Sequence, residues 1–484
     1  MLEINNQYTL MKRRIDTELL KLYFNGDLEK SIDYLPIDII PRDRDASRCC
    51  LYKERAMVRY RIMALLGVDI EKEDDEYKSL KEFACNSLNK KIEVFPTLTT
   101  IKESCSGCPD EQFKITESCR GCFARPCLEN CPKDAITFVN GKAQIVEELC
   151  IKCGKCLNVC PFHAVIHIPV PCEASCPVDA VHKNSEGVVE IDHEKCVDCG
   201  HCSRSCPFGA IVERSSLMHV AKMLKGEENV VAMIAPAIEG QFPGMLDQII
   251  SAIKKLNFSD VVEVAEGAYI TANHEAQELK ERKGSFMTTS CCPAYVSLVE
   301  KHIPFLKENV STALSPMAYA ALLCKERYKD AKIVFIGPCL AKKAEAAKLG
   351  TIDAVITFSE LASLFIAKDI DVNKEEKTTP SDDKYYSECR DFAFSTGVGQ
   401  SVMRYSEKII NIENIDGVDK KNYRVMKTWA KKAPQADLVE VMYCEGGCLA
   451  GPGVLVNPKI AMRLRNAATV EKVVTDDNRE KKRA

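Results

Sequence analysis

The chain has 484 residues, of which 46% are hydrophobic and 28% are charged, and its formal net charge is −4. These values are ordinary for a globular protein of about three domains, and they exclude a disordered chain, a coiled-coil rod and a collagen-like fibre. The Lys and Arg residues are scattered, which argues against nucleic acid as a partner. No apolar run approaches the ~20 residues of a membrane-spanning helix, and the first residues lack the apolar core of a signal peptide. We therefore expect a cytoplasmic protein that does not bind a membrane.

Cysteine is the unusual component of this composition. The chain contains 26 cysteines, and sixteen of them lie between Cys105 and Cys206. Dense disulfide frameworks belong to short secreted chains, whereas thiols in a long chain kept in a reducing compartment usually bind metal or take part in chemistry. The middle of the chain is therefore predicted to bind metal.

Residues 1–95 are predicted to be mainly helical, because apolar side chains in the segment 57–65 recur near one helical face. No pattern in this region indicates a function. Its three cysteines, Cys49, Cys50 and Cys85, lack a ligand spacing, and we expect them to be buried free thiols.

The next region, 96–212, repeats a ferredoxin-type spacing, C-x-x-C-x-x-C-x-x-x-C-P. In this motif three closely spaced thiolates bind one 4Fe-4S cube, and the fourth cysteine, followed by proline, binds the other cube of a pair. The spacing is complete at 150–160 and at 196–206, and a slightly longer version runs over 119–131. Zinc bound by paired cysteines is the alternative, but zinc requires neither the third cysteine nor the proline.

The motifs at 119–131 and 150–160 together form one predicted two-cluster ferredoxin. Its expected ligand sets are Cys119, Cys122, Cys127 and Cys160 for one cluster, and Cys150, Cys153, Cys156 and Cys131 for the other. The motif at 196–206 lacks a complete partner half, because only Cys172 and Cys176-Pro177 precede it at the right spacing.

Cys105 and Cys108 can complete this second ferredoxin. The expected ligand sets are then Cys105, Cys108, Cys172 and Cys206 for one cluster, and Cys196, Cys199, Cys202 and Cys176 for the other. The first ferredoxin, 119–160, is thereby inserted within a second ferredoxin fold, 105–206, and the sixteen cysteines hold about four 4Fe-4S clusters. The alternative is that Cys105 and Cys108 bind nothing, or bind a separate zinc ion.

Residues 213–484 have a different pattern, which begins with a predicted linker helix at 215–226. Short apolar runs then alternate with amphipathic segments, as is typical of parallel strands covered by helices on both faces. The expected strands are 230–238, 260–265, 286–292, 332–339, 354–358, 392–396 and 438–444. A charged loop is expected at 371–384 and a frayed tail at 476–484.

Five cysteines lie where these apolar runs end. They are Cys291, Cys292, Cys339, Cys444 and Cys448. Ligands of α/β sheets collect at the carboxyl ends of the strands, so we expect these five thiols to converge on one crevice. The predicted fold class is α+β and multidomain, with a helical N-terminal region, ferredoxin-like 4Fe-4S domains and a two-lobed α/β domain with parallel sheets.

Three cysteine motifs in the α/β domain carry a family resemblance. They are T-T-S-C-C-P-A-Y at 288–295, G-P-C-L-A-K-K-A-E at 337–345 and M-Y-C-E-G-G-C-L-A-G at 442–451. In this order they resemble the signature motifs of the iron-only (FeFe) hydrogenases, in particular the branch with Ala-Tyr after Cys-Cys-Pro. The resemblance implies a catalytic H-cluster, in which a 4Fe-4S cube is joined to a two-iron unit bearing carbonyl, cyanide and a bridging dithiolate amine.

The resemblance also implies roles for individual residues. Four of them would bind the cube, namely Cys292, Cys339, Cys444 and Cys448, the last of which would bridge to the two-iron unit. Cys291 would exchange a proton with the bridging amine, and Lys342 would donate to an iron-bound cyanide. Met442 would pack near the two-iron unit. Glycine at 337, Met317 and Tyr443 depart from the residues common in the family and change the surroundings of that unit.

A proton relay is predicted on the segment that precedes the first motif. Glu275, Glu278 and Arg282 have a spacing that places them on one helical face, which by itself is also typical of any solvated helix. They match, with Ser311, the residue types of the family's proton relay, and this makes the relay the favoured interpretation.

The predicted function is that of a ferredoxin-dependent hydrogenase that interconverts H2 with protons and electrons. The expected partners are a ferredoxin or similar soluble electron carrier and the maturation enzymes that supply the two-iron unit. Two alternatives are a non-catalytic hydrogenase-like iron–sulfur assembly factor and an H2 sensor. Relatives of both kinds typically lack the first cysteine of the pair, which is present here as Cys291.

Overall fold

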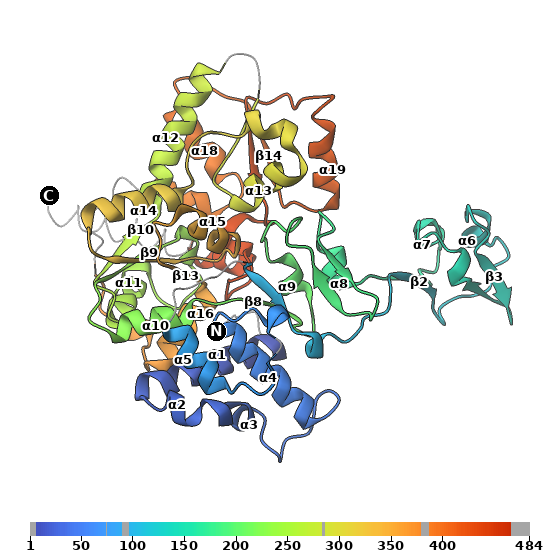
Figure 1. Cartoon of the computed structure of the whole chain (residues 1–484). Coiled ribbons are helices and arrows are strands. Elements are labelled where there is room, and N and C mark those ends of the chain that lie inside the picture. The colour runs from blue at the N-terminus through green and yellow to red at the C-terminus, as the bar shows by residue number, and fades with distance from the viewer. Residues whose placement is uncertain (1–5, 74, 90–95, 283–285, 379–386, 466–484) are drawn as a thin grey trace.

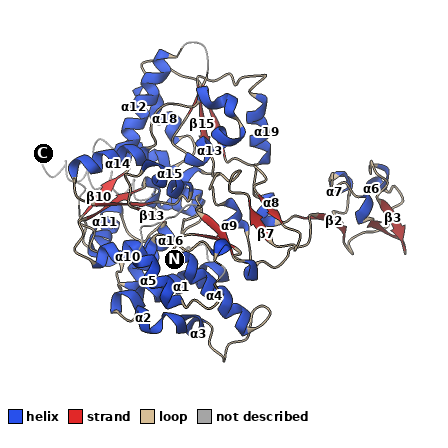
Figure 2. Cartoon of the chain, in the orientation of Figure 1, coloured by secondary structure: helices blue, strands red, loops and turns tan. Residues whose placement is uncertain are grey.

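The computed structural model describes residues 6–73, 75–89, 96–282, 286–378 and 387–465. Figure 1 shows a helical N-terminal region packed against a larger α/β body, and a small lobe that projects from them on the right. Strands lie in the body, in the segment that carries the lobe and in the lobe itself (Figure 2). The predicted fold class is confirmed. Among the described residues, no helix combines the length and apolar character needed to cross a membrane.

The N-terminal region is helical, as predicted, and shares its core with the α/β body. Its elements are α1 (Gln7–Asn25), α2 (Leu28–Ser31), η1 (Ile32–Tyr34), α3 (Leu35–Ile39), α4 (Leu51–Leu65), η2 (Ile70–Lys72) and α5 (Leu80–Asn89). Helix α1 buries Ile15, Leu19 and Leu20 in the core that also contains the central strands of the body. Burial of apolar side chains on both sides of this contact holds the region to the body.

The expectation of buried thiols in this region is wrong, because none of the three cysteines is fully buried. Cys49 and Cys50 are exposed, and Cys85 is half-buried. Cys49 and Cys50 are exposed because they lie directly before α4, in a segment that passes over the surface.

The cysteine-rich middle consists of two small units, an inner module and an outer lobe. In the sequence, the outer lobe is inserted between η3 and α8 of the inner module. The inner module is built from β1 (Leu98–Thr100), η3 (Lys102–Ser104), α8 (Pro171–Ala174), β6 (Val181–Lys183), β7 (Val189–Ile191), α9 (His201–Ser205) and β8 (Ile211–Glu213). The outer lobe is built from β2 (Gln112–Ile115), α6 (Pro126–Glu129), β3 (Ile136–Val139), β4 (Lys142–Ile145), η4 (Glu147–Leu149), α7 (Lys155–Val159) and β5 (Val165–Ile168). Strand β1 pairs with β8 and β2 pairs with β5, both antiparallel, so the outer lobe leaves and re-enters the inner module through neighbouring strands.

Two parallel sheets form the α/β body. The first has the order β10 (Asp260–Glu263), β9 (Val230–Ile234), β12 (Lys332–Ile336) and β13 (Ala354–Ile356), and the second has the order β11 (Met287–Thr288), β15 (Leu438–Met442) and β14 (Ile412–Asp416). Every neighbouring pair is parallel. All residues of β9 and β15 are buried, as expected for strands covered on both faces.

Helices connect and cover these strands. They are α10 (Leu217–Lys225), α11 (Leu246–Lys255), α12 (Ala265–Glu281), α13 (Pro293–His302), α14 (Pro316–Arg327), α15 (Ala341–Leu349), α16 (Phe358–Ala367), α18 (Gly397–Tyr405) and α19 (Lys420–Thr428). Short 3-10 turns complete the body, namely η5 (Pro236–Ile238), η6 (Pro304–Asn309), η7 (Val372–Lys374), η8 (Ser387–Ala393) and η9 (Gly447–Ala450).

In the α/β body, one predicted strand is wrong and one described strand, β14, was not predicted. The apolar run 392–396 ends η8 and turns, because the Phe394 N–H donates to the Asp391 carbonyl and the Gly397 N–H donates to the Phe394 carbonyl. The unpredicted strand is β14, whose residues are half-buried or exposed and so lack the apolar run of the other strands. The loop expected at 371–384 begins with η7, and residues 379–384 and the tail lie outside the described residues.

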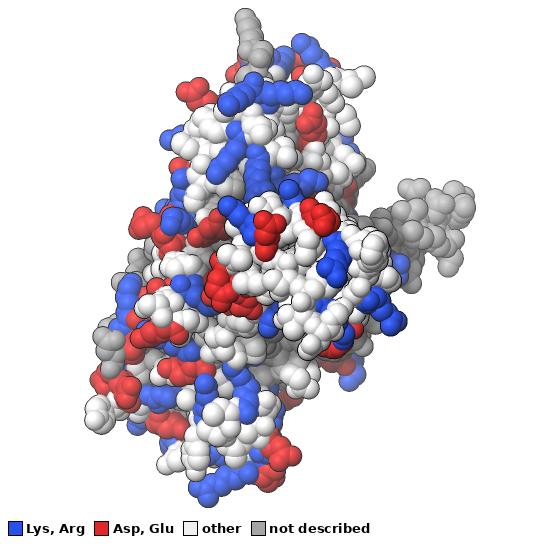
Figure 3. All heavy atoms as spheres, turned by 90° about the vertical axis from the view of Figure 1, so that its right-hand side faces the viewer, with Lys and Arg blue, Asp and Glu red and all other residues white. Residues whose placement is uncertain are grey.

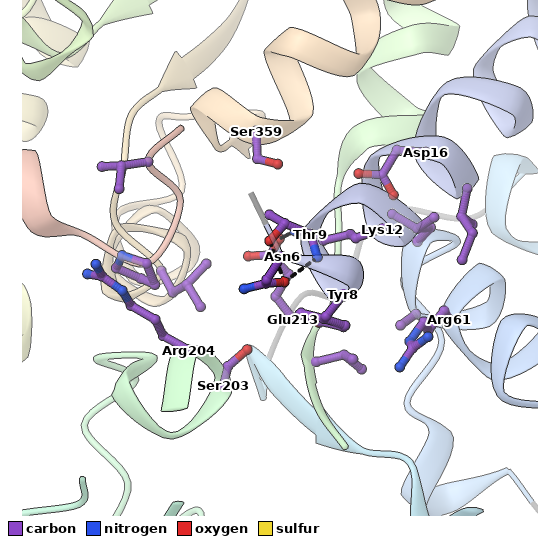
Figure 4. Close-up of a pocket in the computed structure, with 17 residues that line it drawn as sticks. Asn6, Tyr8, Thr9, Lys12, Asp16, Arg61, Ser203, Arg204, Glu213 and Ser359 are labelled. Atoms are coloured by element: carbon purple, nitrogen blue, oxygen red, sulfur yellow. Dashed lines mark hydrogen bonds and ion pairs between the residues drawn. The ribbon is translucent and has the colours of Figure 1, made fainter. Parts of the chain in front are cut away.

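A charged cavity of about 120 Å³ lies where α1 and α4 face β8 and α16 (Figure 4). Lys12 on α1 pairs with Glu213 on β8 at one side of this cavity. Asp16, one helical turn after Lys12, is fully buried, and neither of its carboxylate oxygens has a hydrogen-bond partner among the residues that the structure describes. Burial, assisted by the charges of Glu360 and Glu213, raises the pKa of Asp16 to about 7.

Replacing Asp16 with asparagine is expected to stabilise the protein more at pH 8 than at pH 5. A carboxyl group whose pKa is higher in the folded chain than in the unfolded chain lowers the stability of the protein as the pH rises between these two pKa values. The amide has no such loss, so the advantage of Asp16→Asn should grow by about 2–3 kcal/mol across this interval. Thermal unfolding at both pH values measures it. The exposed Asp38→Asn is the control, and an advantage independent of pH would contradict the assignment.

Candidate active site

Five cysteines from separate parts of the chain line one cavity of about 90 Å³ in the α/β body. They are Cys291, Cys292, Cys339, Cys444 and Cys448, and Lys342 and Met442 line the same cavity. The first pair follows β11, the third cysteine follows β12, and the last two follow β15. Parallel strands present their carboxyl ends at one edge of a sheet, and here both sheets contribute such an edge. The structure thus brings together all five thiols that the sequence placed at strand ends.

The four thiols expected to bind a cube are hard to ionise in the protein alone. Burial raises the pKa of Cys339 to about 11 and that of Cys448 to about 12. It also raises the pKa of Cys292 and, strongly, that of Cys444. Near neutral pH these sulfurs become thiolates only when cations offset their charge, which iron ions do. The donor set therefore fits an iron–sulfur cube.

A single metal ion does not fit this donor set. In the described part of the chain, no three His, Cys, Asp or Glu side chains are grouped closely enough to hold one ion. A cube has no such requirement, because each of its cysteines binds a different iron corner.

Lys342 places a cation in the cavity wall. Its side chain is buried on α15, and its Nζ donates to Ser315 Oγ at 2.9 Å and to Glu345 Oε2 at 2.7 Å. It also donates to the Cys291 carbonyl at 3.4 Å. Burial disfavours its charged form, but Glu345 and the neighbouring thiols outweigh burial and raise the pKa of Lys342. Lys342 is therefore charged and oriented by three acceptors.

Cys291 lies between the cavity and a buried carboxyl group. Burial raises the pKa of its thiol, and the nearby Glu275 carboxyl raises it further. Glu275 on α12 is fully buried, and its Oε1 accepts from Ser290 N at 3.0 Å and from Ser290 Oγ at 3.3 Å. Within the described part of the chain, its Oε2 has no hydrogen-bond partner. Burial raises the pKa of Glu275 to about 8, so this group can both hold and release a proton near neutral pH.

The remaining predicted relay residues meet one turn further along α12. Glu278 Oε2 accepts from Ser311 Oγ at 2.8 Å, and its Oε1 accepts from Arg282 Nη2 at 2.9 Å. Burial raises the pKa of Glu278, but the hydrogen bonds from Arg282, Thr312 and Ser311 outweigh it and lower the pKa. The side chains of Glu278 and Arg282 are 14% and 18% exposed, so this end of the row reaches the surface.

Sequence reasoning did not assign roles to three further polar residues of the site. They are Ser290, which holds Glu275, and Ser315 and Glu345, which hold Lys342. Glu345 stands three residues after Lys342 on a helix, and this spacing could have indicated the pair. Ser315 is distant in sequence, and only the packing of α14 against the site brings it there.

In the middle region, two of the four predicted cysteine groups each line one pocket. Cys176, Cys196, Cys199 and Cys202 line one pocket in the inner module, and Cys131, Cys150, Cys153 and Cys156 line another in the outer lobe. Burial raises the pKa of Cys108 and of Cys172, and the nearby Cys206 raises both further. Cys105 also raises the pKa of Cys108. Burial also raises the pKa of Cys127, with further contributions from Cys122 and Cys160. Cys119 packs against the same hydrophobic core as Cys127.

The same backbone turn follows four Cys-Pro pairs of the middle region. Three residues after the cysteine, the backbone has positive φ, at Asp134, His163, Asp179 and Gly209. The next N–H then donates back to the cysteine sulfur at 3.3–3.4 Å, at Cys131, Cys160, Cys176 and Cys206. Such hydrogen bonds stabilise the charged sulfur of a bound cluster. Each of the four predicted ligand sets contains one cysteine with this turn.

Models of known families match both the α/β body and the cysteine-rich middle region. Residues 228–452 match the model of the iron only hydrogenase large subunit, C-terminal domain, and residues 119–168 and 166–217 match the LdpA Fe-S cluster-binding domain. Residues 228–452 are therefore similar to the iron-only hydrogenases. The hydrogenase-like match contains all five cysteines of the cavity, and the other two matches contain fourteen of the sixteen cysteines of the middle region, all but Cys105 and Cys108.

Individual relatives of this hydrogenase-like chain are distant. Iron hydrogenase 1 of Clostridium pasteurianum is 26% identical over 78% of this chain and 74% of its own length. The cytosolic Fe-S cluster assembly factor NAR1 of Yarrowia lipolytica is 29% identical over 24% of this chain and 28% of its own length. A solved FeFe-hydrogenase HydA1 from Chlamydomonas reinhardtii has a TM-score of 0.44 and 21% identity, covering 52% of this chain and 88% of that one.

Proposed function

We propose that the chain is a hydrogenase that interconverts H2 with two protons and two electrons. Its H-cluster would be held by Cys292, Cys339, Cys444 and Cys448. The observation that carries the proposal is the fifth thiol, because Cys291 lines the same cavity and lies beside the buried Glu275 carboxyl. An electron carrier that lacks catalysis has no use for a free thiol next to a titratable group at this place.

The two-iron unit, when bound, supplies the centre at which H2 is split or formed. The protein moves the proton. Cys291 Sγ holds it at the cavity wall, Glu275 receives it or returns it, and Glu278 with Ser311 continues the row toward Arg282 at the surface. Lys342 presents a fixed positive charge to a ligand in the cavity.

Electrons would travel between the cavity and the outer lobe through about four 4Fe-4S clusters. The outer lobe projects from the body (Figure 1), and its Cys153 is exposed. Seen from that side, acidic and basic side chains are mixed with uncharged surface (Figure 3). The exposed Phe123 and Ile151 stand next to cysteine motifs of this lobe. These features support a small soluble carrier such as a ferredoxin as the partner, and the many reduced thiols support a cytoplasmic location.

Infrared spectroscopy of the anaerobically purified protein, produced with maturation enzymes, tests the proposal. The expected result is a set of carbonyl and cyanide stretches together with H2 evolution from a chemically reduced ferredoxin. The same preparation without maturation enzymes should contain the 4Fe-4S clusters but neither the bands nor the activity. A matured protein with full iron content and no such bands would overturn the proposal.

The second candidate function is an iron–sulfur assembly factor. The similarity to NAR1 favours it, but covers only 24% of this chain. In that case the protein would retain its cubes, lack the infrared bands and release no H2. The infrared experiment therefore separates the two functions directly.

A further inference from the structure

Tyr443 lies between two groups of cysteines. Its side chain lines the cavity of the five cysteines and also lines the pocket formed by Cys176, Cys196, Cys199 and Cys202. It is 1% exposed. The side chain thus separates the proposed catalytic site from the nearest proposed ferredoxin-type cluster.

The position of Tyr443 in the chain explains this placement. It follows the last residue of β15, and successive side chains of a strand point to opposite faces. Met442 accordingly packs in the core beside α12 and Cys291, whereas Tyr443 packs in the core of the inner module. The Val418 N–H donates to the Tyr443 carbonyl at 3.0 Å and fixes the backbone there.

The Tyr443 hydroxyl has no hydrogen-bond partner among the described residues. A buried hydroxyl without a partner is costly, and proteins normally provide one. The other fully buried tyrosine of this core follows that rule, because Tyr295 donates to Thr288 Oγ1 at 2.8 Å. Phenylalanine would fill the space of Tyr443 equally well without this cost.

The surroundings of Tyr443 indicate the missing acceptor. The cysteines whose charges act on it most are Cys199 and Cys176 of the inner module, followed by Cys292. The ring of His201, which stands between Cys199 and Cys202, lies 5.4 Å from the Tyr443 ring. The hydroxyl therefore faces sulfur ligands on the side of the inner module, where a bound cluster presents negatively charged sulfur.

We propose that the Tyr443 hydroxyl donates a hydrogen bond to a sulfur of the 4Fe-4S cluster held by Cys176, Cys196, Cys199 and Cys202. This inference rests on the ligand set of the proposed function. The cluster accepts one electron from its neighbour on the ferredoxin side and passes one electron to the cube, while the phenol keeps its proton throughout. A hydrogen bond to sulfur favours the more negative, reduced cluster, so Tyr443 raises its potential.

The variant Tyr443→Phe tests the inference. Full-length protein is produced anaerobically without maturation enzymes, its iron is counted, and its clusters are titrated by redox potentiometry with electron paramagnetic resonance detection. We expect the oxidised-to-reduced ratio of one cluster to rise about tenfold at a fixed potential, equivalent to about −59 mV for a one-electron couple. The other cluster signals should keep their potentials.

Tyr423→Phe is the matched control, because Tyr423 is buried in the same core but lines neither pocket. In deuterium oxide, the wild type should also show one exchangeable deuteron coupled to the reduced cluster that Tyr443→Phe lacks. An unchanged potential, an equal shift in the control, or a wild type without this cluster signal would overturn the inference. A shifted potential in a protein that never shows carbonyl and cyanide bands would uphold it while refuting the hydrogenase proposal.

Discussion

Replacing Cys291 with alanine is expected to lower H2 evolution and H2 uptake by at least about 100-fold, the contribution of a positioned proton-transfer group. The thiol lines the cavity but is not among the four expected ligands, so the cube should remain bound. Hydrogen evolution and uptake assays measure the loss. Infrared spectra and iron counts should show that the cofactor is retained.

The control for this experiment is Cys324→Ala. Cys324 is also a fully buried free thiol, but it lies in α14 and does not line the cavity. This variant should retain activity apart from a modest loss of stability. Full turnover in Cys291→Ala would remove the proton-transfer role of the thiol, and loss of iron from that variant would assign Cys291 to the cube instead.

Replacing Glu275 with glutamine should reduce turnover by about 100-fold or more, since the amide keeps the shape of the side chain but cannot exchange a proton. The amide can still interact with Ser290, so the fold of this region should persist. Activity measured against pH separates this effect from misfolding. The wild type should lose its ability to donate protons as the pH rises through the pKa of Glu275, about 8, and the residual activity of the variant should lack this titration.

Glu281→Gln is the matched control, because Glu281 lies on the same helix but is exposed. It should behave as wild type. If both variants kept full activity, the proton would leave the cavity by another path, although the assignment of the cysteine ligands would be unaffected.

Short-range patterns explain which parts of the fold were predictable from the sequence. Strands such as β9 and β15 are fully buried, so their apolar runs identified them. Strand β14 lies at the edge of its sheet and is only half-buried, and its sequence therefore resembles a loop. The run at 392–396 is apolar because it packs in the core, but local turns satisfy its backbone. Burial by itself does not distinguish these two cases.

In the candidate site, too, some residues could be predicted from the sequence and others could not. Motif spacing and strand ends were sufficient to bring the five cavity cysteines together. Residues that orient other residues left no such signal, because their partners come from distant segments, as Ser315 does for Lys342. Likewise, no pattern on α1 indicates that Asp16 would face a charged cavity, since Glu213 and Glu360 approach it only in the folded chain.

The N-terminal region contacts the inner module at two backbone carbonyls and one carboxylate. Arg48 donates to the Ser104 carbonyl at 2.8 Å, Arg61 donates to the Phe208 carbonyl at 3.3 Å, and Lys12 pairs with Glu213. The same helices share a core with the α/β body, so they act as a brace across both units. The outer lobe is joined to the inner module through the segments that lead into β2 and out of β5. Under the proposed function, a carrier that docks on the lobe would load this connection, while the braced inner module would keep its proposed clusters at a constant distance from the cavity.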